Sequence, residues 1–310
     1  MATTSGTAAA ETAGAIPGQR GARTRRGPAD ADGGGALNVF SHGFLALWAV
    51  MIVLPLFWIV LGSFKSDSEI GASAWSWPSN WTFEAFGRAW EKGIGDYFAN
   101  TLIVLAGSIP LTMLLGAMAA YVLARYEFRG NRFLYYFFVA GAMFPVYLGL
   151  VPLYFLMGQF GMLNTYHGII LVYVAYSLPF TVFFLHAFFR TLPTAIHEAA
   201  VIDGASHTRT FFQVMVPMAK PGLISVGIFN VLGQWNQYIL PMTLMQKQSG
   251  FDEDRFLLTQ GLVLLNQQQG YEGDLPVIFA GMTMAMLPVI VVYLSFQRQV
   301  QSGLTAGTLK

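Results

Sequence analysis

The sequence contains no cysteine and few charged residues. Without cysteine, disulfides, thiolate catalysis and cysteine-ligated metal sites are excluded. Charged residues make up only 11% of the 310 residues, while 55% are hydrophobic. An average soluble domain has about 25% charged residues. This composition predicts an integral membrane protein.

Motifs for nucleotide binding and for metal catalysis are also missing. There is no G-x-x-x-x-G-K-[ST] motif, and none of the five lysines follows a glycine. The chain therefore cannot hold nucleotide phosphates with a P-loop. The five histidines, at positions 42, 167, 186, 197 and 207, show no H-E-x-x-H or other ligand spacing. We expect no enzyme activity, no metal and no directly bound cofactor, and any ATPase must be a separate polypeptide.

Apolar runs of the length that crosses a bilayer, about 20 residues, occur six times. They predict an all-α protein with six transmembrane helices, at about residues 43–64, 98–124, 133–157, 168–189, 222–245 and 275–297. A proline lies in every one of these runs, where it can kink a helix. The run from Phe256 to Leu265 is too short to span and is predicted to form an amphipathic helix on the outer face.

The uneven placement of charge predicts the topology. If the N-terminus is inside, the inner segments hold 12 of the 17 Lys and Arg, and the two long outer loops hold ten of the 16 acidic residues. Positive residues gather on the cytoplasmic side, so both termini are expected there. Residues 1–40 lack an apolar segment and are predicted to be a disordered cytoplasmic tail, followed by a six-span domain over 41–310 in the cell membrane.

The charged segment 190–221, between the fourth and fifth spans, is predicted to form a short helix–turn–helix at the membrane surface. Pro193 suits the first turn of a helix, and Gly204 suits its left-handed end. Glu198 and Asp203 then place one carboxylate at each end of the first helix, which has small alanines between them. Such a surface favours insertion into a groove on another protein. The alternative is an ordinary loop whose carboxylates are merely solvated.

At these residues the chain resembles the permease subunits of binding-protein-dependent ABC importers. Their cytoplasmic signature is E-A-A, three residues, G, nine residues and I-x-L-P. Here Glu198, Ala199, Ala200, Gly204 and Pro217 match, with valine at both aliphatic positions of the closing group. The run Asp203 to Ser206 and the tail 303–307 resemble the carbohydrate-importing branch, of the maltose-permease G type.

This resemblance implies the type I ABC importer permease fold and a multi-subunit assembly. The expected partners are a second permease subunit, a dimer of ABC ATPases that uses the ATP, an extracytoplasmic sugar-binding protein and the lipid bilayer, with no nucleic acid. It also implies that the segment 190–221 is the coupling loop. The residues expected to contact the ATPase are Glu198, Ala199, Ala200, Asp203, Gly204 and Pro217. Residues 304–310 either touch the ATPase as well or form a frayed end.

The most polar cluster within a predicted span has two interpretations. It consists of Gln234, Trp235, Asn236, Gln237 and Tyr238. Amides cost several kcal/mol when unpaired in hydrocarbon, so these side chains should face either a sugar-conducting path or a partner helix, with equal weight. Asn100 and Thr101 are a second, less pronounced polar pair at the outer end of the second predicted span. For this pair, the favoured interpretation is a cap of the helix at the membrane interface.

Two other classes of protein remain as alternatives. A stand-alone secondary carrier or channel is disfavoured, because no Lys, Arg, Asp or Glu lies inside a predicted span. A membrane scaffold whose 198–204 loop binds some other protein fits the topology but leaves the full motif spacing unexplained. The residues do not identify the sugar.

Overall fold

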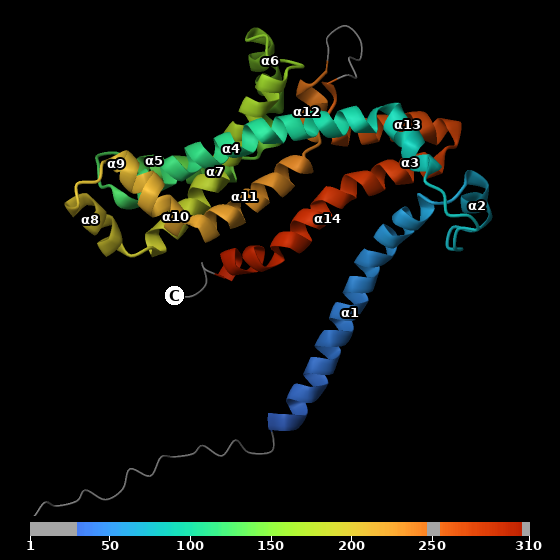
Figure 1. Ribbon diagram of the computed structural model, residues 1–310, viewed down its shortest axis with the longest axis horizontal. Coiled ribbons are helices and arrows are strands. Elements are labelled where there is room, and N and C mark those ends of the chain that lie inside the picture. The colour runs from blue at the N-terminus through green and yellow to red at the C-terminus, as the bar shows by residue number, and fades with distance from the viewer. Residues whose placement is uncertain (1–29, 247–254, 306–310) are drawn as a thin grey trace, which may run out of the picture. The chain divides into compact units, whose positions relative to one another are not determined.

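The computed structural model describes residues 30–246 and 255–305, and within these ranges every regular element is a helix (Figure 1). In chain order the helices are α1 (Asp30–Gly62), α2 (Asp67–Ala72), α3 (Glu84–Ala89), η1 (Trp90–Ile94), α4 (Gly95–Arg125), α5 (Asn131–Met143), η2 (Val146–Gly149), α6 (Leu150–Gln159), α7 (Tyr166–Thr191), α8 (Thr194–Ile202), α9 (His207–Arg209), η3 (Thr210–Met215), α10 (Val216–Met218), α11 (Lys220–Trp235), α12 (Ile239–Leu244), α13 (Leu258–Glu272) and α14 (Leu275–Thr305). Residues 1–29 of the predicted disordered tail lie outside the described residues, and its last residues, 30–40, are helical because α1 begins at Asp30.

The chain divides into two compact units, residues 1–54 and 55–310. In the first unit, the described part of α1 exposes its large apolar side chains from Val39 to Leu54. Phe44 and Trp48 stack on one another along this helix. An apolar helix with such an exposed surface suits a span surrounded by lipid.

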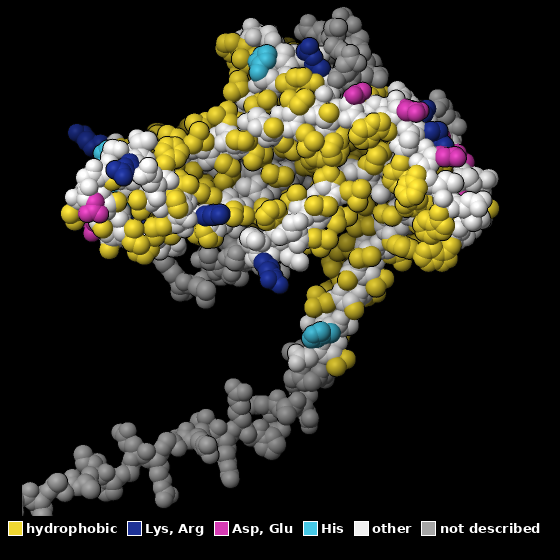
Figure 2. Space-filling model, in the orientation of Figure 1, with side chains coloured by type: hydrophobic (Ala, Val, Ile, Leu, Met, Phe, Trp, Pro, Cys, Tyr) yellow, Lys and Arg dark blue, Asp and Glu magenta, His cyan; other side chains and the backbone are white. Residues whose placement is uncertain are grey.

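Long apolar helices form the second unit, and α4 packs most extensively on α7. Gly116 lies where this pair approaches closely, because a Cβ atom there would clash with the Thr181 side chain. Figure 1 shows α8 and α9 at one end of this unit, and α2, α3 and α13 at the other. In Figure 2, hydrophobic side chains cover the middle of the visible face, and most charged side chains lie toward its two ends.

The spans are of two kinds. Four helical stretches are continuous, apolar and long enough to cross a membrane: Asn38–Gly62, Glu84–Arg125, Tyr166–Thr191 and Leu275–Gln299. Two further pairs are bent: Asn131–Met143 with Val146–Gln159, by 89°, and His207–Met218 with Lys220–Trp235, by 79°. If each bent pair is one span, the described residues contain six, the number that the sequence predicts.

Two of the predicted spans are interrupted in the structure. The predicted span 133–157 is interrupted at Phe144 and Pro145, both of which have extended backbone. Proline removes a backbone donor and disfavours helix in the residue before it. The predicted span 222–245 contains α11, which ends at Trp235, and the separate helix α12.

The end of the unit that contains α2, α3 and α13 is held by buried polar contacts. Asn100 donates to the Phe256 carbonyl (3.0 Å), and Thr101 accepts from the Leu258 N–H (2.8 Å), so both fix the start of α13. An amphipathic helix was expected at 256–265, and α13 covers most of that range. The interpretation of this pair as a cap at the end of a span agrees with these contacts. Arg88 and Asp274 form an ion pair (3.0 Å) that joins α3 to the start of α14.

Candidate coupling surface and transport cavity

The helix α8 ends in a Schellman motif built on Gly204. The Gly204 N–H donates to the Val201 carbonyl (3.0 Å), and the Ala205 N–H donates to the Ala200 carbonyl (3.0 Å). Gly204 has a φ of +76°, the left-handed conformation that glycine adopts without a steric penalty. The predicted role of this glycine in ending the helix is confirmed. Ser206 then begins α9 by accepting a hydrogen bond from the Arg209 N–H (3.3 Å).

The exposed face of α8 is apolar with one carboxylate. None of its nine residues is buried, and Ala195, Glu198, Ala199 and Ile202 follow the i, i+3, i+4, i+7 spacing of a single helix face, all exposed. Ile202 is 84% exposed. The expectation of a carboxylate at each end is wrong for Glu198, because α8 begins at Thr194 and Glu198 lies in its middle. Asp203 does lie at the C-terminal end.

Contacts to the end of α4 hold this segment against the bundle. The Arg125 guanidinium donates to the carbonyls of Phe189 and Leu192, each at 2.7 Å, and so caps the end of α7 directly before α8. The Tyr121 hydroxyl lies 3.2 Å from Nδ1 of His197 in α8. Burial, followed by the positive charge of Arg125, lowers the pKa of His197.

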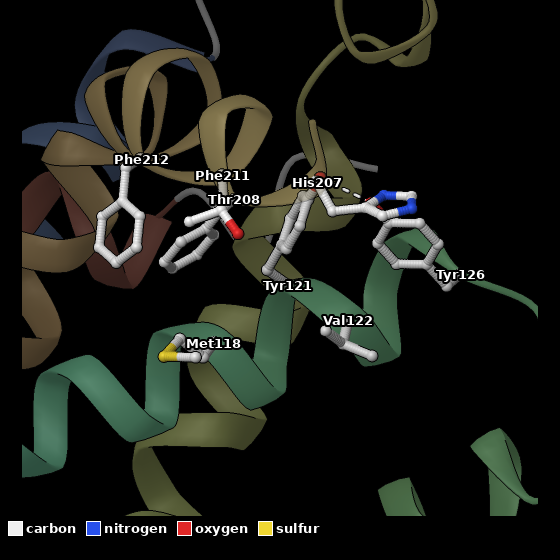
Figure 3. Close-up of a pocket in the computed structure, with 8 residues that line it drawn as sticks. All are labelled: Met118, Tyr121, Val122, Tyr126, His207, Thr208, Phe211 and Phe212. Atoms are coloured by element: carbon white, nitrogen blue, oxygen red, sulfur yellow. Dashed lines mark hydrogen bonds between the residues drawn. The ribbon is translucent and has the colours of Figure 1, made fainter. Parts of the chain in front are cut away.

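A hollow of about 380 Å³ lies between the end of α4 and the helices α9 and η3. Its lining is mostly apolar, and Tyr126 lies beside the His207 ring at one side (Figure 3). The lining residues are Met118, Tyr121, Val122, Tyr126, His207, Thr208, Phe211 and Phe212. Pro217 lies further along, exposed in α10, directly before the 79° bend into α11.

A second hollow, of about 480 Å³, opens at the break between α5 and η2. It combines aromatic rings with a few polar side chains, a lining typical of small-molecule sites. The aromatic members are Phe144, Tyr147, Tyr176, Phe180 and Phe229, and the polar members are Ser177, Asn230 and Gln234. We call this hollow the transport cavity, after the role that is proposed for it below.

Gln234 both lines the transport cavity and joins three helices. Its side-chain oxygen accepts a short hydrogen bond from Ser108 in α4, and its amide nitrogen donates to Ser177 in α7 (2.9 Å). Asn230, one turn earlier, donates to Thr181 (2.9 Å). The interpretation of this amide as an interhelical hydrogen-bonding group is confirmed by these contacts, and its role in a sugar-conducting path stays a prediction.

The other members of the predicted polar cluster point elsewhere. The Trp235 ring packs edge-on against Phe98 (centroids 5.4 Å apart), and its indole N–H donates to the Ala285 carbonyl (3.3 Å). Asn236 is exposed at the break between α11 and α12. Gln237 is buried, and its carbonyl accepts from Thr259 (2.8 Å). Tyr238 is half-buried at the start of α12.

Sequence reasoning missed most of the cavity, because its residues come from four separate helices, α5, η2, α7 and α11, and carry no common motif. The sequence feature that could have indicated this cavity is Pro145, which lies among aromatic side chains that the fold brings close to Gln234. It also missed the pairing of His197 with Tyr121 in α4 and of His207 with Tyr126 directly after α4. The available signal was a histidine near the start of each of two short helices.

Long apolar helices, among them two bent pairs that can each form one span, define this protein as an all-helical multi-pass membrane protein. The family model described as "Binding-protein-dependent transport system inner membrane component" matches residues 112–306. This is more than half of the chain, and the chain belongs to that family. It is therefore a multi-pass inner-membrane permease subunit of the ABC transporter class and not an enzyme.

Similar proteins agree with this assignment. The chain is 48% identical over 271 residues to the "Diacetylchitobiose uptake system permease protein NgcG" of Streptomyces coelicolor, covering 87% of this chain and 88% of the relative. It is 33% identical to the "Trehalose transport system permease protein SugB" of Mycobacterium tuberculosis, covering 85% and 97%. In fold it matches a chain of a bacterial ABC transporter involved in alginate import, with a TM-score of 0.73, 22% identity, and coverage of 85% of this chain and 96% of that one.

Proposed function

We propose that this permease forms half of the translocation path of an ATP-driven carbohydrate importer and is driven through α8. The proposed assembly contains a second permease subunit, two ATPase subunits that use the ATP and an extracytoplasmic sugar-binding protein. Both termini and the segment 190–221 lie on the cytoplasmic side in this proposal. The uneven distribution of Lys and Arg supports that orientation.

The unpartnered surface of α8 is the observation that carries the coupling role. Isolated helices shorter than about 12 residues are marginal in water, yet α8 has nine residues and buries none of them. Its exposed face offers small and apolar side chains with Glu198 at the centre. An ATPase cleft with an apolar floor and a basic group opposite Glu198 would complement this face. Closure of the ATPase dimer then moves α8 and the spans attached to it. For this coupling, the closed ATPase dimer must bind one conformation of the permease more tightly than the other.

The lining of the transport cavity supports a carbohydrate as the cargo. Aromatic rings suit the C–H faces of a sugar ring, and the hydroxyl and amide groups of Ser177, Asn230 and Gln234 suit its hydroxyls. The relatives at 48% and 33% identity are named for diacetylchitobiose and trehalose. We therefore propose a disaccharide or short oligosaccharide as cargo, with an N-acetylated amino sugar as the first candidate.

The test is reconstitution of the permease with the products of neighbouring genes in lipid vesicles. We expect an ATPase to copurify, and labelled diacetylchitobiose or trehalose to enter only with ATP and the binding protein. Gln234→Leu should lower uptake while the complex still assembles, because the substitution removes a polar group of the cavity wall. Uptake by this chain alone, without any ATPase, would instead support the secondary carrier.

A further inference from the structure

Four side chains at the inner end of α4 lie in one continuous series of hydrogen bonds. The Tyr121 hydroxyl lies 3.2 Å from Nδ1 of His197 and 3.3 Å from the Tyr126 hydroxyl. The Tyr126 hydroxyl lies 2.9 Å from Nδ1 of His207. The series runs from α8, through the end of α4 and the residue after it, to the start of α9. We call these four residues the tyrosine–histidine chain.

We propose that the tyrosine–histidine chain is the joint that transmits movement of the coupling helix α8 to the span α4, with Tyr121 as its central positioning residue. This inference rests on the proposed function of α8. The joint connects both short helices of the coupling segment to the same end of α4 and so makes them move with it.

Burial makes Tyr121 the fixed member of this joint. It is 3% exposed, and its ring packs against Phe189 and Phe211 with centroids 5.7 and 5.2 Å away. By contrast, α8 buries no residue of its own. His197 is half-buried and meets both tyrosine rings edge-on, at 6.0 and 5.7 Å. These contacts connect α8 to the end of α4, and Arg125 caps the end of α7 directly before α8.

Counting hydrogens shows when the series is complete. Three hydrogen bonds need three hydrogens, and the two tyrosine hydroxyls supply two of them. The third must be an N–H at Nδ1 of one imidazole, while Nδ1 of the other accepts. If both Nδ1 atoms carry a hydrogen, one hydroxyl oxygen accepts both from its histidine and from the other tyrosine, and its own hydrogen turns away. All three links therefore persist when the accepting imidazole is protonated.

The groups around His197 oppose its protonation. Arg125 of α4 and His207 of α9 disfavour a positive charge there, and only Glu198 of its own helix favours one. Tyr121 and Tyr126 are the other ionisable groups in contact with it. The joint therefore forms with an uncharged His197.

The test compares Tyr121→Phe with Tyr136→Phe in the reconstituted importer. Tyr121→Phe keeps the ring but removes the hydroxyl that takes part in two of the three links. Tyr136 is 60% exposed in α5, so its variant loses a hydroxyl without touching the joint. We expect Tyr121→Phe to assemble and hydrolyse ATP, but to carry about tenfold fewer sugar molecules per ATP, the equivalent of about 1.4 kcal/mol of coupling. Tyr136→Phe should match the wild type.

The rate of ATP hydrolysis supplies a second readout that separates transmission of movement from a general structural role. Tyr121→Phe should keep the wild-type ATPase rate and thermal stability and lose only the sugar carried per ATP. An assembled Tyr121→Phe complex with wild-type transport per ATP overturns the joint, and so does one whose ATP hydrolysis falls in proportion to its transport. If Tyr121→Phe does not assemble, Tyr126→Phe takes its place with the same two outcomes. If the wild type itself binds no ATPase, the proposed function fails instead.

Discussion

The substitution Gly204→Ala separates a local backbone effect from an effect on a partner. A Cβ atom at Gly204 would meet nothing within 4 Å in this chain, so the only internal cost is its φ of +76°. For an L-residue, that conformation costs roughly 1–2 kcal/mol. The free helix end can avoid this strain by fraying, but an α8 docked in a cleft must keep its Schellman turn and bear it. We therefore expect binding of the ATPase to weaken roughly 5- to 30-fold.

The matched control is Gly161→Ala. Gly161, in the turn between α6 and α7, also has a positive φ (+65°) and open space around it. Both variants should lose similar thermal stability. Titration of the ATPase onto the permease pair in nanodiscs should show weaker binding for Gly204→Ala alone. Equal affinities for the two variants would refute the docking of α8, since the strain would then have no consequence for a partner.

Three further substitutions test packing, the loop after α1 and pH dependence. Gly116→Ala should lower the free energy of unfolding by roughly 1–3 kcal/mol, because its Cβ atom would clash with the Thr181 side chain. Gly233→Ala should not, because nothing lies within 4 Å of a Cβ atom there. Thermal melting in detergent distinguishes the two variants. Lys65→Met should expose residues 73–76 to limited proteolysis, because the buried Lys65 ammonium donates to the carbonyls of Ser73 and Ala74 (both 3.1 Å). Each of these charge-assisted hydrogen bonds contributes about 1.5–3 kcal/mol. The lowered pKa of His197 means that the folded state binds fewer protons, so stability is full above about pH 6.5 and falls as the pH drops below it. His197→Gln should flatten that part of the pH–stability curve. An unchanged slope would contradict the attribution of this pH dependence to His197.

The spans could be predicted because hydrophobic length is a direct physical signal. A lipid-exposed helix must be apolar over about 20 residues, and each predicted span contains or overlaps a helix of the structure. The turn at Gly204 could be predicted as well, because few residues other than glycine adopt its conformation. The position of Glu198 within α8 was misjudged, because the helix begins at Thr194 and Pro193 lies before it as the N-cap.

Tertiary contacts could not be predicted in the same way. His197 and Tyr121 are 76 residues apart, and Ser108 and Gln234 are 126 apart. Neither pair leaves a periodic signal, because each depends on how α4 is rotated against its neighbours. Trp235 illustrates the same limit. It follows Gln234 directly, yet its ring turns away from the transport cavity toward Phe98.

The sequence also could not show which proline interrupts a helix. Pro55, Pro110, Pro179 and Pro288 lie inside continuous helices, but the chain leaves the helix at Pro145. Irregular backbone at membrane depth is tolerated only where it is buried in protein or lines a water-filled cavity. The break at Pro145 lies in the wall of the transport cavity. This coincidence ties the irregular backbone to the proposed path, since a break facing lipid would leave its carbonyl and amide groups without partners.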